Sequence, residues 1–344
     1  VGGIFVAFGN IRFLVLWLTR DCNLRCRYCY ADAGKHKEYM NFEVAKRAID
    51  LCGENCIKLQ FAGGEPILNF KLVERLYDYI KSNNISAILQ MQANGTLIDY
   101  EIARHIKKMN IAMGVSFDGP IEINEYLRGN SKDVLRGMSI LREEGIMANI
   151  NCVVTDRNIE YLDKLVDIAY YLGNVGGIGL DLLRLTGRAI DTKSEVMEAS
   201  PLDIKSSLEK AYLRTKKIES ISGKKVIIRE IEEARKRLYN PPKCGVYCHA
   251  SYGGSAVVLP NGDIYPCGSL VGLEEYYMGN VLDEKTIKNI KVEIIPSARC
   301  QNCKYKSFCQ GACPARGIIN KNGVITEQDC TLRKTSFEIV EKET

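Results

Sequence analysis

The chain has 344 residues, of which 46% are hydrophobic and 26% are charged, so it can bury a large core. This composition excludes a disordered chain, a collagen-like chain and a coiled coil. The formal net charge of +5 is too small to indicate nucleic acid or a membrane surface as a partner. The most apolar run, Phe13–Leu18, is far shorter than a membrane span or the core of a signal peptide. We therefore expect a cytoplasmic protein.

Short apolar runs alternate with longer amphipathic segments between residues 11 and 184, a pattern typical of βα units around a parallel sheet. We expect six strands, at Arg12–Thr19, Ile57–Ala62, Ala87–Gln92, Ala112–Phe117, Met147–Val154 and Gly177–Leu183. Helices are expected to begin near Asn41, Asn69, Ile98, Ser131 and Ile159, several of them with a capping side chain. Six such units predict an α/β fold in the form of a partial (β/α)6 TIM-like barrel, which lacks the eight strands of a closed one.

The rest of the chain has a different character. Residues 193–242 form charged helical segments that we interpret as a linker or insertion, ended by Pro241-Pro242. Residues 243–344 are rich in cysteine, glycine and turn residues and carry few apolar residues, so we expect bound metal to organise them. We therefore predict a barrel over residues 1–192, a linker over 193–242 and a small second domain over 243–344.

Cysteine usage is the strongest functional signal. The chain has 14 cysteines but only 3 histidines. Eleven of the cysteines fall into one group near residue 25 and another after residue 243, whereas Cys52, Cys56 and Cys152 are interpreted as ordinary thiols. Fixed close spacings in a long cytosolic chain indicate metal ligation rather than disulfides. Ligation by thiolates alone favours iron–sulfur clusters or structural zinc.

The first group, Cys22, Cys26 and Cys29, follows the first expected strand, at the end where barrel enzymes carry their active sites. Three thiolates leave one iron of a [4Fe–4S] cube open to a small molecule. A zinc knuckle completed by a distant ligand is the alternative. The C-x3-C-x2-C spacing resembles the signature of the radical S-adenosylmethionine (SAM) superfamily. That resemblance implies reductive cleavage of SAM to a 5'-deoxyadenosyl radical.

Other motifs at the ends of the expected strands strengthen the resemblance. Gly63-Gly64-Glu65-Pro66, an ordinary turn if taken alone, resembles the family's site for the amine of SAM, and Ala93-Asn94-Gly95-Thr96 resembles its Asn-Gly-Thr turn. Ser116 and Arg128, twelve residues apart, match a pair that holds the carboxylate and ribose of SAM, although Arg128 alone could be a surface residue. The resemblance assigns SAM contacts to Tyr28, Gly63, Gly64, Glu65, Asn94, Ser116, Asp118, Arg128, Val153 and Leu183.

The second cysteine group resembles the SPASM extension of radical SAM enzymes in every interval from Cys248 onward. The resemblance implies two auxiliary [4Fe–4S] clusters with interleaved ligands. Cys244, Cys248, Cys267 and Cys313 would hold the first, and Cys300, Cys303, Cys309 and Cys330 the second. With the first group, this gives three [4Fe–4S] clusters and SAM as the expected cofactors. A pair of zinc ribbons is the alternative for these cysteines.

SPASM proteins of this kind mostly modify peptides, so the resemblance implies an oxidoreductase that forms a thioether or carbon–carbon cross-link in a ribosomally made precursor peptide. We expect net oxidation of the substrate, with electrons leaving through saturated auxiliary clusters and arriving from a ferredoxin- or flavodoxin-type donor. Few residues precede the first expected strand, so we expect any leader recognition to use a separate protein, the barrel edge or the charged insertion at 193–240. The sequence identifies no acid or base residue.

Several alternatives remain open. Sulfatase-maturing members carry an aspartate directly after the cysteine that corresponds to Cys267, whereas Gly268 stands here, so that activity is disfavoured. Modification of a haem or tetrapyrrole side chain, or maturation of another cofactor, is a rival, since the run from Arg184 to Arg188 resembles one seen in some haem-pathway and peptide-modifying members alike. A multi-cluster electron carrier and a zinc-organised scaffold are the non-enzymatic alternatives.

Overall fold

The computed structural model describes residues 10–191, 195–240 and 247–343. Two features predicted from the sequence lie outside these ranges, namely the ligand Cys244 and the chain break at Pro241-Pro242. Among the described residues, no helix combines the length and the apolar character needed to cross a membrane.

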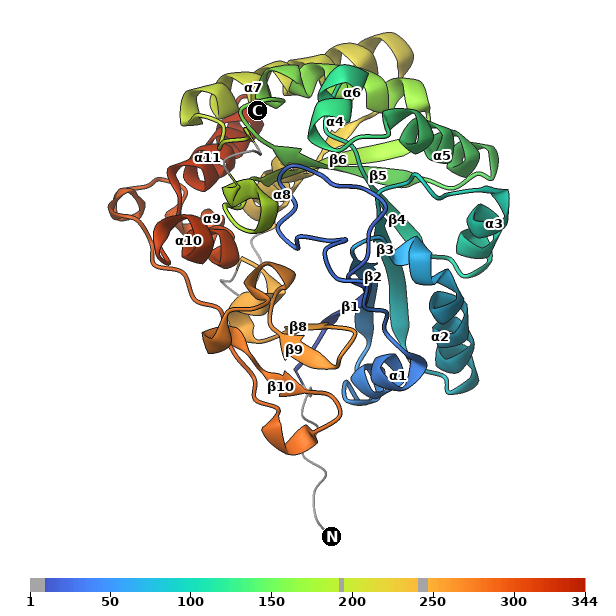
Figure 1. Ribbon diagram of the computed structural model, residues 1–344. Coiled ribbons are helices and arrows are strands. Elements are labelled where there is room, and N and C mark those ends of the chain that lie inside the picture. The colour runs from blue at the N-terminus through green and yellow to red at the C-terminus, as the bar shows by residue number, and fades with distance from the viewer. Residues whose placement is uncertain (1–9, 192–194, 241–246, 344) are drawn as a thin grey trace.

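All six expected strands are present, and they pair in chain order with every neighbour parallel. They are β1 (Phe13–Thr19), β2 (Ile57–Gly63), β3 (Ala87–Ala93), β4 (Ala112–Ser116), β5 (Ala148–Val154) and β6 (Val175–Leu182). Figure 1 shows these strands curving into an open barrel with helices on the outside. The α/β class and the partial barrel are therefore confirmed.

The covering helices lie between successive strands. They are α1 (Phe42–Asp50), α2 (Phe70–Ser82), α3 (Tyr100–Lys108), α4 (Ile121–Leu127), α5 (Ser131–Glu143) and α6 (Leu162–Leu172). The side chain of Asn41 caps α1 by accepting from the amide of Val44 at 2.9 Å, as its sequence position predicts. The short helix α4, which follows Pro120, was not expected.

The two faces of the barrel sheet differ in polarity. In β2, Leu59 and Phe61 are fully buried in the main core, whereas Gln60 between them lines the interior of the barrel. Successive side chains of a strand point to opposite faces, so the apolar residues pack under the helices while the polar ones face the lumen. The barrel interior is therefore a place for polar chemistry rather than a second apolar core.

The sheet continues past the six expected strands. The two-residue strand β7 (Ile227–Ile228) extends it beyond β6, and β8 (Ser255–Val258) pairs in parallel with β1 at the other edge. Two further strands, β9 (Asp263–Tyr265) and β10 (Gly279–Asn280), follow β8 in antiparallel order. One ten-stranded sheet thus runs from the barrel into the cysteine-rich segment. The sequence did not reveal this pairing because β8 has only four residues, all buried.

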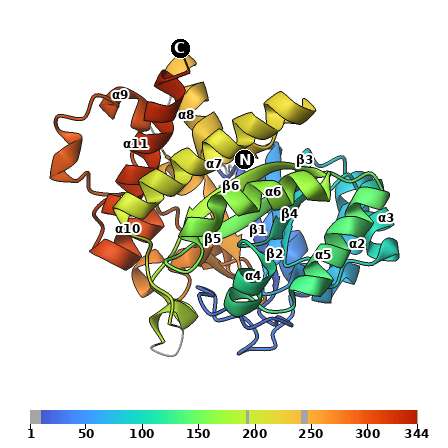
Figure 2. The same cartoon turned by 90° about the horizontal axis from the view of Figure 1, so that it is seen from above.

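Five helices complete the described chain. They are α7 (Pro201–Ser222), α8 (Arg229–Tyr239), α9 (Lys306–Cys309), α10 (Pro314–Lys321) and α11 (Glu327–Glu341). Ser200 caps α7 by accepting from the amide of Asp203. Helix α11 packs against α7 and α8, as Figure 2 shows from above, and its Phe337 and Val340 join the main core. The C-terminal helix therefore ties the cysteine-rich segment to the helical layer outside β6.

Candidate functional site

The first three cysteines lie on the loop between β1 and α1, called here the cysteine loop (residues 20–41), which crosses the mouth of the barrel in Figure 1. Arg188 holds this loop from β6's side by donating to the carbonyl of Cys26 from its Nε at 2.8 Å and to that of Cys29 from its amide at 3.0 Å. The amide of Arg27 donates to the carbonyl of Leu127 at 2.9 Å. These bonds fix the loop over the carboxyl ends of the strands.

The three thiols share one apolar cluster with Leu24 and Tyr28. Burial raises the pKa of Cys22 to about 11, and the charges of Glu65, Cys26 and Cys29 add to the effect. Burial, followed by the charge of Cys29, also raises the pKa of Cys26, although Arg128 opposes it. Buried thiols that raise one another's pKa are the expected state of ligands that give up their protons only when a metal binds.

Glu65 is fully buried beside the cysteine loop. Its two carboxylate oxygens accept from the amides of Asn94 at 2.7 Å and Ile67 at 3.2 Å. Burial raises the pKa of Glu65 to about 7, and these two backbone bonds oppose the shift. The side-chain Nδ2 of Asn94 donates to the Oδ1 of Asn23 at 2.8 Å, so Asn94 connects this carboxylate to the cysteine loop. A buried carboxylate near neutral pKa can bind an ammonium group.

The two glycines before Glu65 allow the cysteine loop to come close. Gly63 has a φ of +124°, which favours glycine. A Cβ on Gly64 would lie 1.9 Å from the carbonyl oxygen of Asp21. The segment predicted as a SAM-binding motif is thus more than a surface turn, because the cysteine loop packs directly on it.

Tyr28, Asp118 and Arg128 meet in the same buried cluster. The hydroxyl of Tyr28 donates to the carboxylate of Asp118. The Nη1 of Arg128 donates to that hydroxyl at 2.5 Å and lies 3.9 Å from the Oδ2 of Asp118. The amide of Val153 donates to Asp118 at 2.9 Å. The Nε of Arg128 is buried without a hydrogen-bond partner. Such an orphaned donor fits a site completed by an acceptor such as a carboxylate.

The remaining predicted SAM contacts divide into two sets. Leu183 and Val153 pack with Cys26 and Tyr28 in the apolar cluster. Ser116 instead accepts from the side chain of Gln92 at 2.9 Å inside the barrel. The structure therefore gathers all ten predicted positions around the cysteine loop or the adjoining lumen, with Ser116 at the boundary between the two.

Three cysteines of the first auxiliary set come together despite their separation in sequence. Cys248, Cys267 and Cys313 share an apolar cluster with Ala250 and Leu270. Burial raises the pKa of Cys248 and of Cys267, and in both cases the charge of Cys313 adds to the shift. The fourth predicted member, Cys244, lies outside the described residues.

The second auxiliary set surrounds a cavity. Cys300, Cys303, Cys309 and Cys330 all line a space of about 180 Å³ between α9 and α11. Burial raises the pKa of Cys330, and the charges of the other three cysteines raise it further. Among the residues that the structure describes, no three side chains of metal-ligating type already converge on a single ion. A cavity this large suits a polyatomic cluster, since one ion or water molecule needs only about 10–15 Å³ by the same kind of measure.

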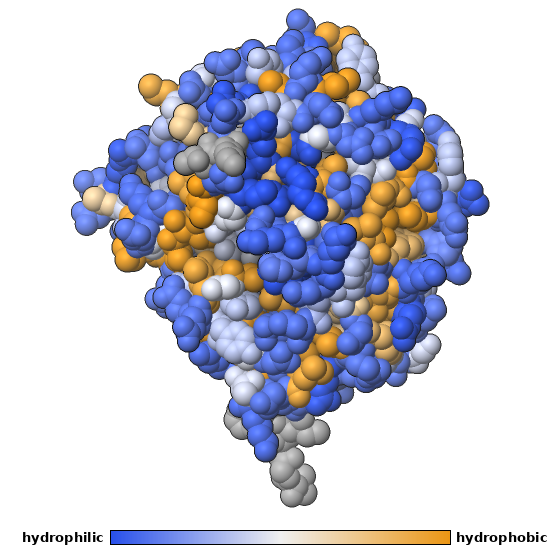
Figure 3. Space-filling model, in the orientation of Figure 1, coloured by the Kyte–Doolittle hydropathy of each residue, from blue (hydrophilic) through white to orange (hydrophobic). Residues whose placement is uncertain are grey.

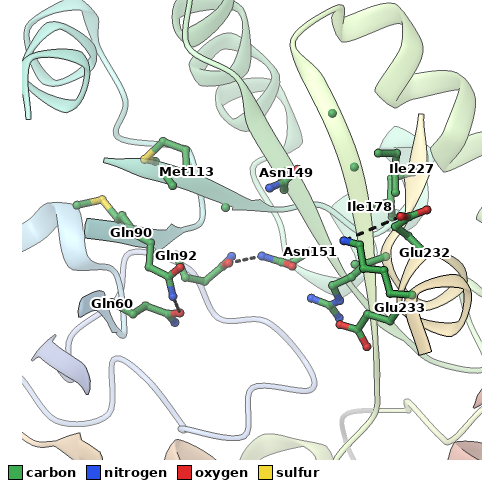
Figure 4. A pocket seen from close by; sticks show the side chains of 18 residues that line it. Gln60, Gln90, Gln92, Met113, Asn149, Asn151, Ile178, Ile227, Glu232 and Glu233 are labelled. Atoms are coloured by element: carbon green, nitrogen blue, oxygen red, sulfur yellow. Dashed lines mark hydrogen bonds and ion pairs between the residues drawn. The ribbon is translucent and has the colours of Figure 1, made fainter. Parts of the chain in front are cut away.

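A lumenal cavity of about 630 Å³ is the main feature that the sequence analysis missed. Figure 4 shows its wall of carboxamides, in which Gln90 donates to Gln60 at 2.8 Å and Asn151 donates to Gln92. The signal was present as polar residues at alternate positions of otherwise apolar strands. In Figure 3, hydrophilic side chains gather over the middle of the molecule with hydrophobic patches on either side.

The fold and the site define a partial α/β barrel with a thiol-rich loop at the carboxyl ends of its strands and further clustered thiols in the C-terminal segment. Residues 18–169 match the family described as the Radical SAM superfamily. The chain is 35% identical to an uncharacterized protein of Methanocaldococcus jannaschii over 87% of this chain and 96% of that one. The chain therefore belongs to the radical SAM superfamily, whose cofactors are SAM and [4Fe–4S] clusters.

Similarity to named enzymes extends over nearly the whole chain. It is 26% identical to the cysteine-type anaerobic sulfatase-maturating enzyme of Clostridium novyi over 96% of this chain and 95% of that one. The solved structure of native anSMEcpe with bound AdoMet and Cp18Cys peptide has the same fold, with a TM-score of 0.78 and 22% identity over 97% of each chain. The protein is thus a radical SAM enzyme related to the maturases.

Proposed function

We propose that this enzyme binds SAM at a [4Fe–4S] cluster held by Cys22, Cys26 and Cys29 and oxidatively cross-links a ribosomally made precursor peptide through a thioether or carbon–carbon bond. When bound at this site, a cluster would supply the electron for reductive cleavage of SAM. The observation that carries the proposal is the buried contact of Tyr28 with Asp118 and Arg128 inside the apolar cluster of the three thiols.

The chain's own residues would orient SAM. The buried carboxylate of Glu65 would accept from the amino group of SAM, and the orphaned Nε of Arg128 would donate to its carboxylate. Tyr28, Val153 and Leu183 supply apolar surface for the adenine, while Gly63 and Gly64 keep the backbone close to the cysteine loop. Asn94, Ser116 and Asp118 connect these groups to the strand ends.

Two auxiliary [4Fe–4S] clusters complete the proposed set of three. The cavity lined by Cys300, Cys303, Cys309 and Cys330 supports one, and the shared burial of Cys248, Cys267 and Cys313 supports the other, with Cys244 as its proposed fourth ligand. Both clusters would have all their irons ligated, so they would carry electrons rather than bind substrate.

A peptide fits the barrel interior. The lumenal cavity presents carboxamides from Gln60, Gln90, Gln92 and Asn151, which can both donate to and accept from a peptide backbone. The charged side chains of Arg229, Glu232, Glu233 and Lys236 line it as well. Haem-type substrates carry anionic propionates and need free cations. Of the two arginines in the run from residue 184 to 188, Arg188 already binds three groups of the cysteine loop, whereas Arg184 keeps an unpaired buried Nε. Arg229 and Lys236 also line the cavity, so the tetrapyrrole alternative stays open.

Gly268 favours a cross-linking reaction over sulfatase maturation. A Cβ at this position would lie 3.2 Å from the indole of Trp17 and 3.3 Å from the hydroxyl of Tyr30. An aspartate there would be crowded by two aromatic residues. The region that carries the base in sulfatase-maturing members is therefore filled by other side chains here.

The test is anaerobic. Protein reconstituted with iron and sulfide is incubated with SAM and dithionite, and 5'-deoxyadenosine is measured together with the mass of peptides encoded by adjacent genes. We expect 5'-deoxyadenosine from the wild type, none from Cys26→Ala, and a peptide that has lost two hydrogens per cross-link. Intact clusters without SAM cleavage would indicate an electron carrier instead, and zinc without acid-labile sulfide would indicate a scaffold. The proposed electron donor, a ferredoxin or flavodoxin, and a separate leader-binding protein can be added to the same assay.

A further inference from the structure

A chain of alternating charges joins the barrel to the first auxiliary cysteines. Arg184, just after β6, binds Asp181 at 2.5 Å, and Arg316 on α10 binds the other oxygen of Asp181 at 2.9 Å. Asp329 on α11 then holds Arg316 with two bonds of 2.9 Å each. The side chains of Arg316 and Asp329 are 3% exposed, whereas those of Arg184 and Asp181 are 14% and 39% exposed. This series of ion pairs, called here the charge ladder (Asp329, Arg316, Asp181, Arg184), is therefore buried at its α11 end and partly exposed at Asp181.

The charge ladder ends on a cysteine. The Nη2 of Arg184 lies 3.8 Å from the sulfur of Cys313, within hydrogen-bond distance for sulfur. The guanidinium carbon also lies 5.8 Å from the ring centre of Tyr30, the residue that follows Cys29. The Nε of Arg184 is buried without a partner. Arg184 therefore stands between the cysteine loop and the first auxiliary cysteines, with donor capacity to spare.

We propose that Arg184 is a positioning residue that raises the reduction potential of the auxiliary cluster held by Cys248, Cys267 and Cys313. The inference rests on the proposed function, because it requires a cluster at these thiols. A reduced cluster carries one more negative charge than an oxidised one, so a fixed cation and a hydrogen bond to a ligand sulfur stabilise the reduced form. Arginine keeps its charge at every pH at which proteins fold.

The remainder of the charge ladder keeps Arg184 in place. Asp181 holds the Nη1 of Arg184 and is itself held by Arg316, which in turn is fixed by Asp329 and by the carbonyl of Leu182 at 2.9 Å. Without the other members of the charge ladder, the long side chain of Arg184 would lose its orientation towards Cys313. The auxiliary cluster nearer the barrel would thus be tuned by a residue of the barrel itself.

The experiment is a redox titration of the reconstituted holoenzyme, followed by electron paramagnetic resonance. Arg184→Gln removes the charge, and Arg184→Lys retains it. We expect the equilibrium constant for one-electron reduction of the first auxiliary cluster to fall about tenfold in Arg184→Gln, equivalent to about 59 mV, and to recover in Arg184→Lys. The cluster at Cys300, Cys303, Cys309 and Cys330 is the internal control, and its potential is expected to stay the same.

Iron and sulfide content and the resonance of each cluster are measured before the titration. Absence of the first auxiliary cluster from the wild type would refute the proposed function. If that cluster is present, an unchanged potential in Arg184→Gln, or an equal shift of both auxiliary clusters, would overturn the role of Arg184.

A measurement on the wild-type protein covers the case in which the Arg184→Gln variant does not assemble the first auxiliary cluster. Wild-type protein is labelled with ¹⁵N-arginine and reduced. Pulsed electron paramagnetic resonance is then used to detect ¹⁵N nuclei that are magnetically coupled to each cluster. We expect a guanidinium nitrogen coupled to the first auxiliary cluster, as the contact between Arg184 and Cys313 requires. The absence of such a coupling would overturn the inference.

Discussion

The hydroxyl of Tyr28 donates a hydrogen bond to the carboxylate of Asp118, although ninety positions separate the two residues in the chain. This bond connects the cysteine loop to the end of β4 and places both groups next to Arg128. The proposed adenine contact and the proposed carboxylate donor are thereby part of one buried network.

Removing the arginine of this network is expected to destabilise the protein strongly. Asp118 has no exposed side-chain surface, so Arg128→Gln leaves a buried carboxylate without its cation, at a cost of about 3 kcal/mol. Thermal unfolding of the reconstituted protein should show the loss. The double variant Arg128→Gln with Asp118→Asn should recover part of it, because no unpaired charge remains. A double variant that unfolds at the temperature of Arg128→Gln would contradict this account.

The buried carboxyl of Glu65 predicts that the free energy of unfolding falls as the pH rises. Its folded pKa of about 7 lies above the ordinary value of about 4.3, so ionisation of the buried carboxyl opposes folding. The stabilising contribution of the protonated group is full below about pH 4 and is lost as the pH rises through 7. Bound SAM should reverse part of this loss, since its ammonium group favours the carboxylate.

The measurement is the unfolding temperature between pH 5 and 8, with and without SAM. We expect the stabilisation by SAM to grow with pH over this range. Calorimetry in two buffers of different ionisation enthalpy should show proton release when SAM binds near pH 6.5, and Glu65→Gln should abolish that release. SAM binding that takes up protons would rule out the proposed role of Glu65.

Gly64→Ala tests the contact beneath the cysteine loop. The new Cβ would overlap the carbonyl of Asp21, which cannot move without moving the loop. We expect the iron and sulfide content to fall by one cluster out of the proposed three. Gly176→Ala is the matched control, because a Cβ there meets no atom closer than 3.8 Å. Equal cluster content in both variants would show that the loop tolerates the change.

The auxiliary cysteines are expected to separate SAM cleavage from product formation. Cys267→Ala or Cys309→Ala removes a ligand of one proposed auxiliary cluster but leaves the cysteine loop unchanged. Such variants should stop peptide modification while retaining some uncoupled formation of 5'-deoxyadenosine, measured by chromatography. Full-rate product formation in either variant would show that the auxiliary clusters are not the route by which electrons leave.

The sequence predicted those features whose signal is local. The strands were found because apolar runs such as Phe13–Leu18 recur at βα spacing. Metal ligation by the closely spaced cysteines stays a prediction. The pairing of β8 with β1 and the charge ladder were not predictable, because each depends on residues far apart in the chain. Asp181 and Arg316, for example, meet across 135 positions.

The strand pair β1–β8 has a consequence for biogenesis. One edge of β1 has its partner at residues 255–258, so it stays uncovered on the ribosome until most of the polypeptide has been synthesised. An uncovered edge invites pairing with other nascent chains. Truncation before residue 255 should therefore give aggregates rather than a free-standing barrel.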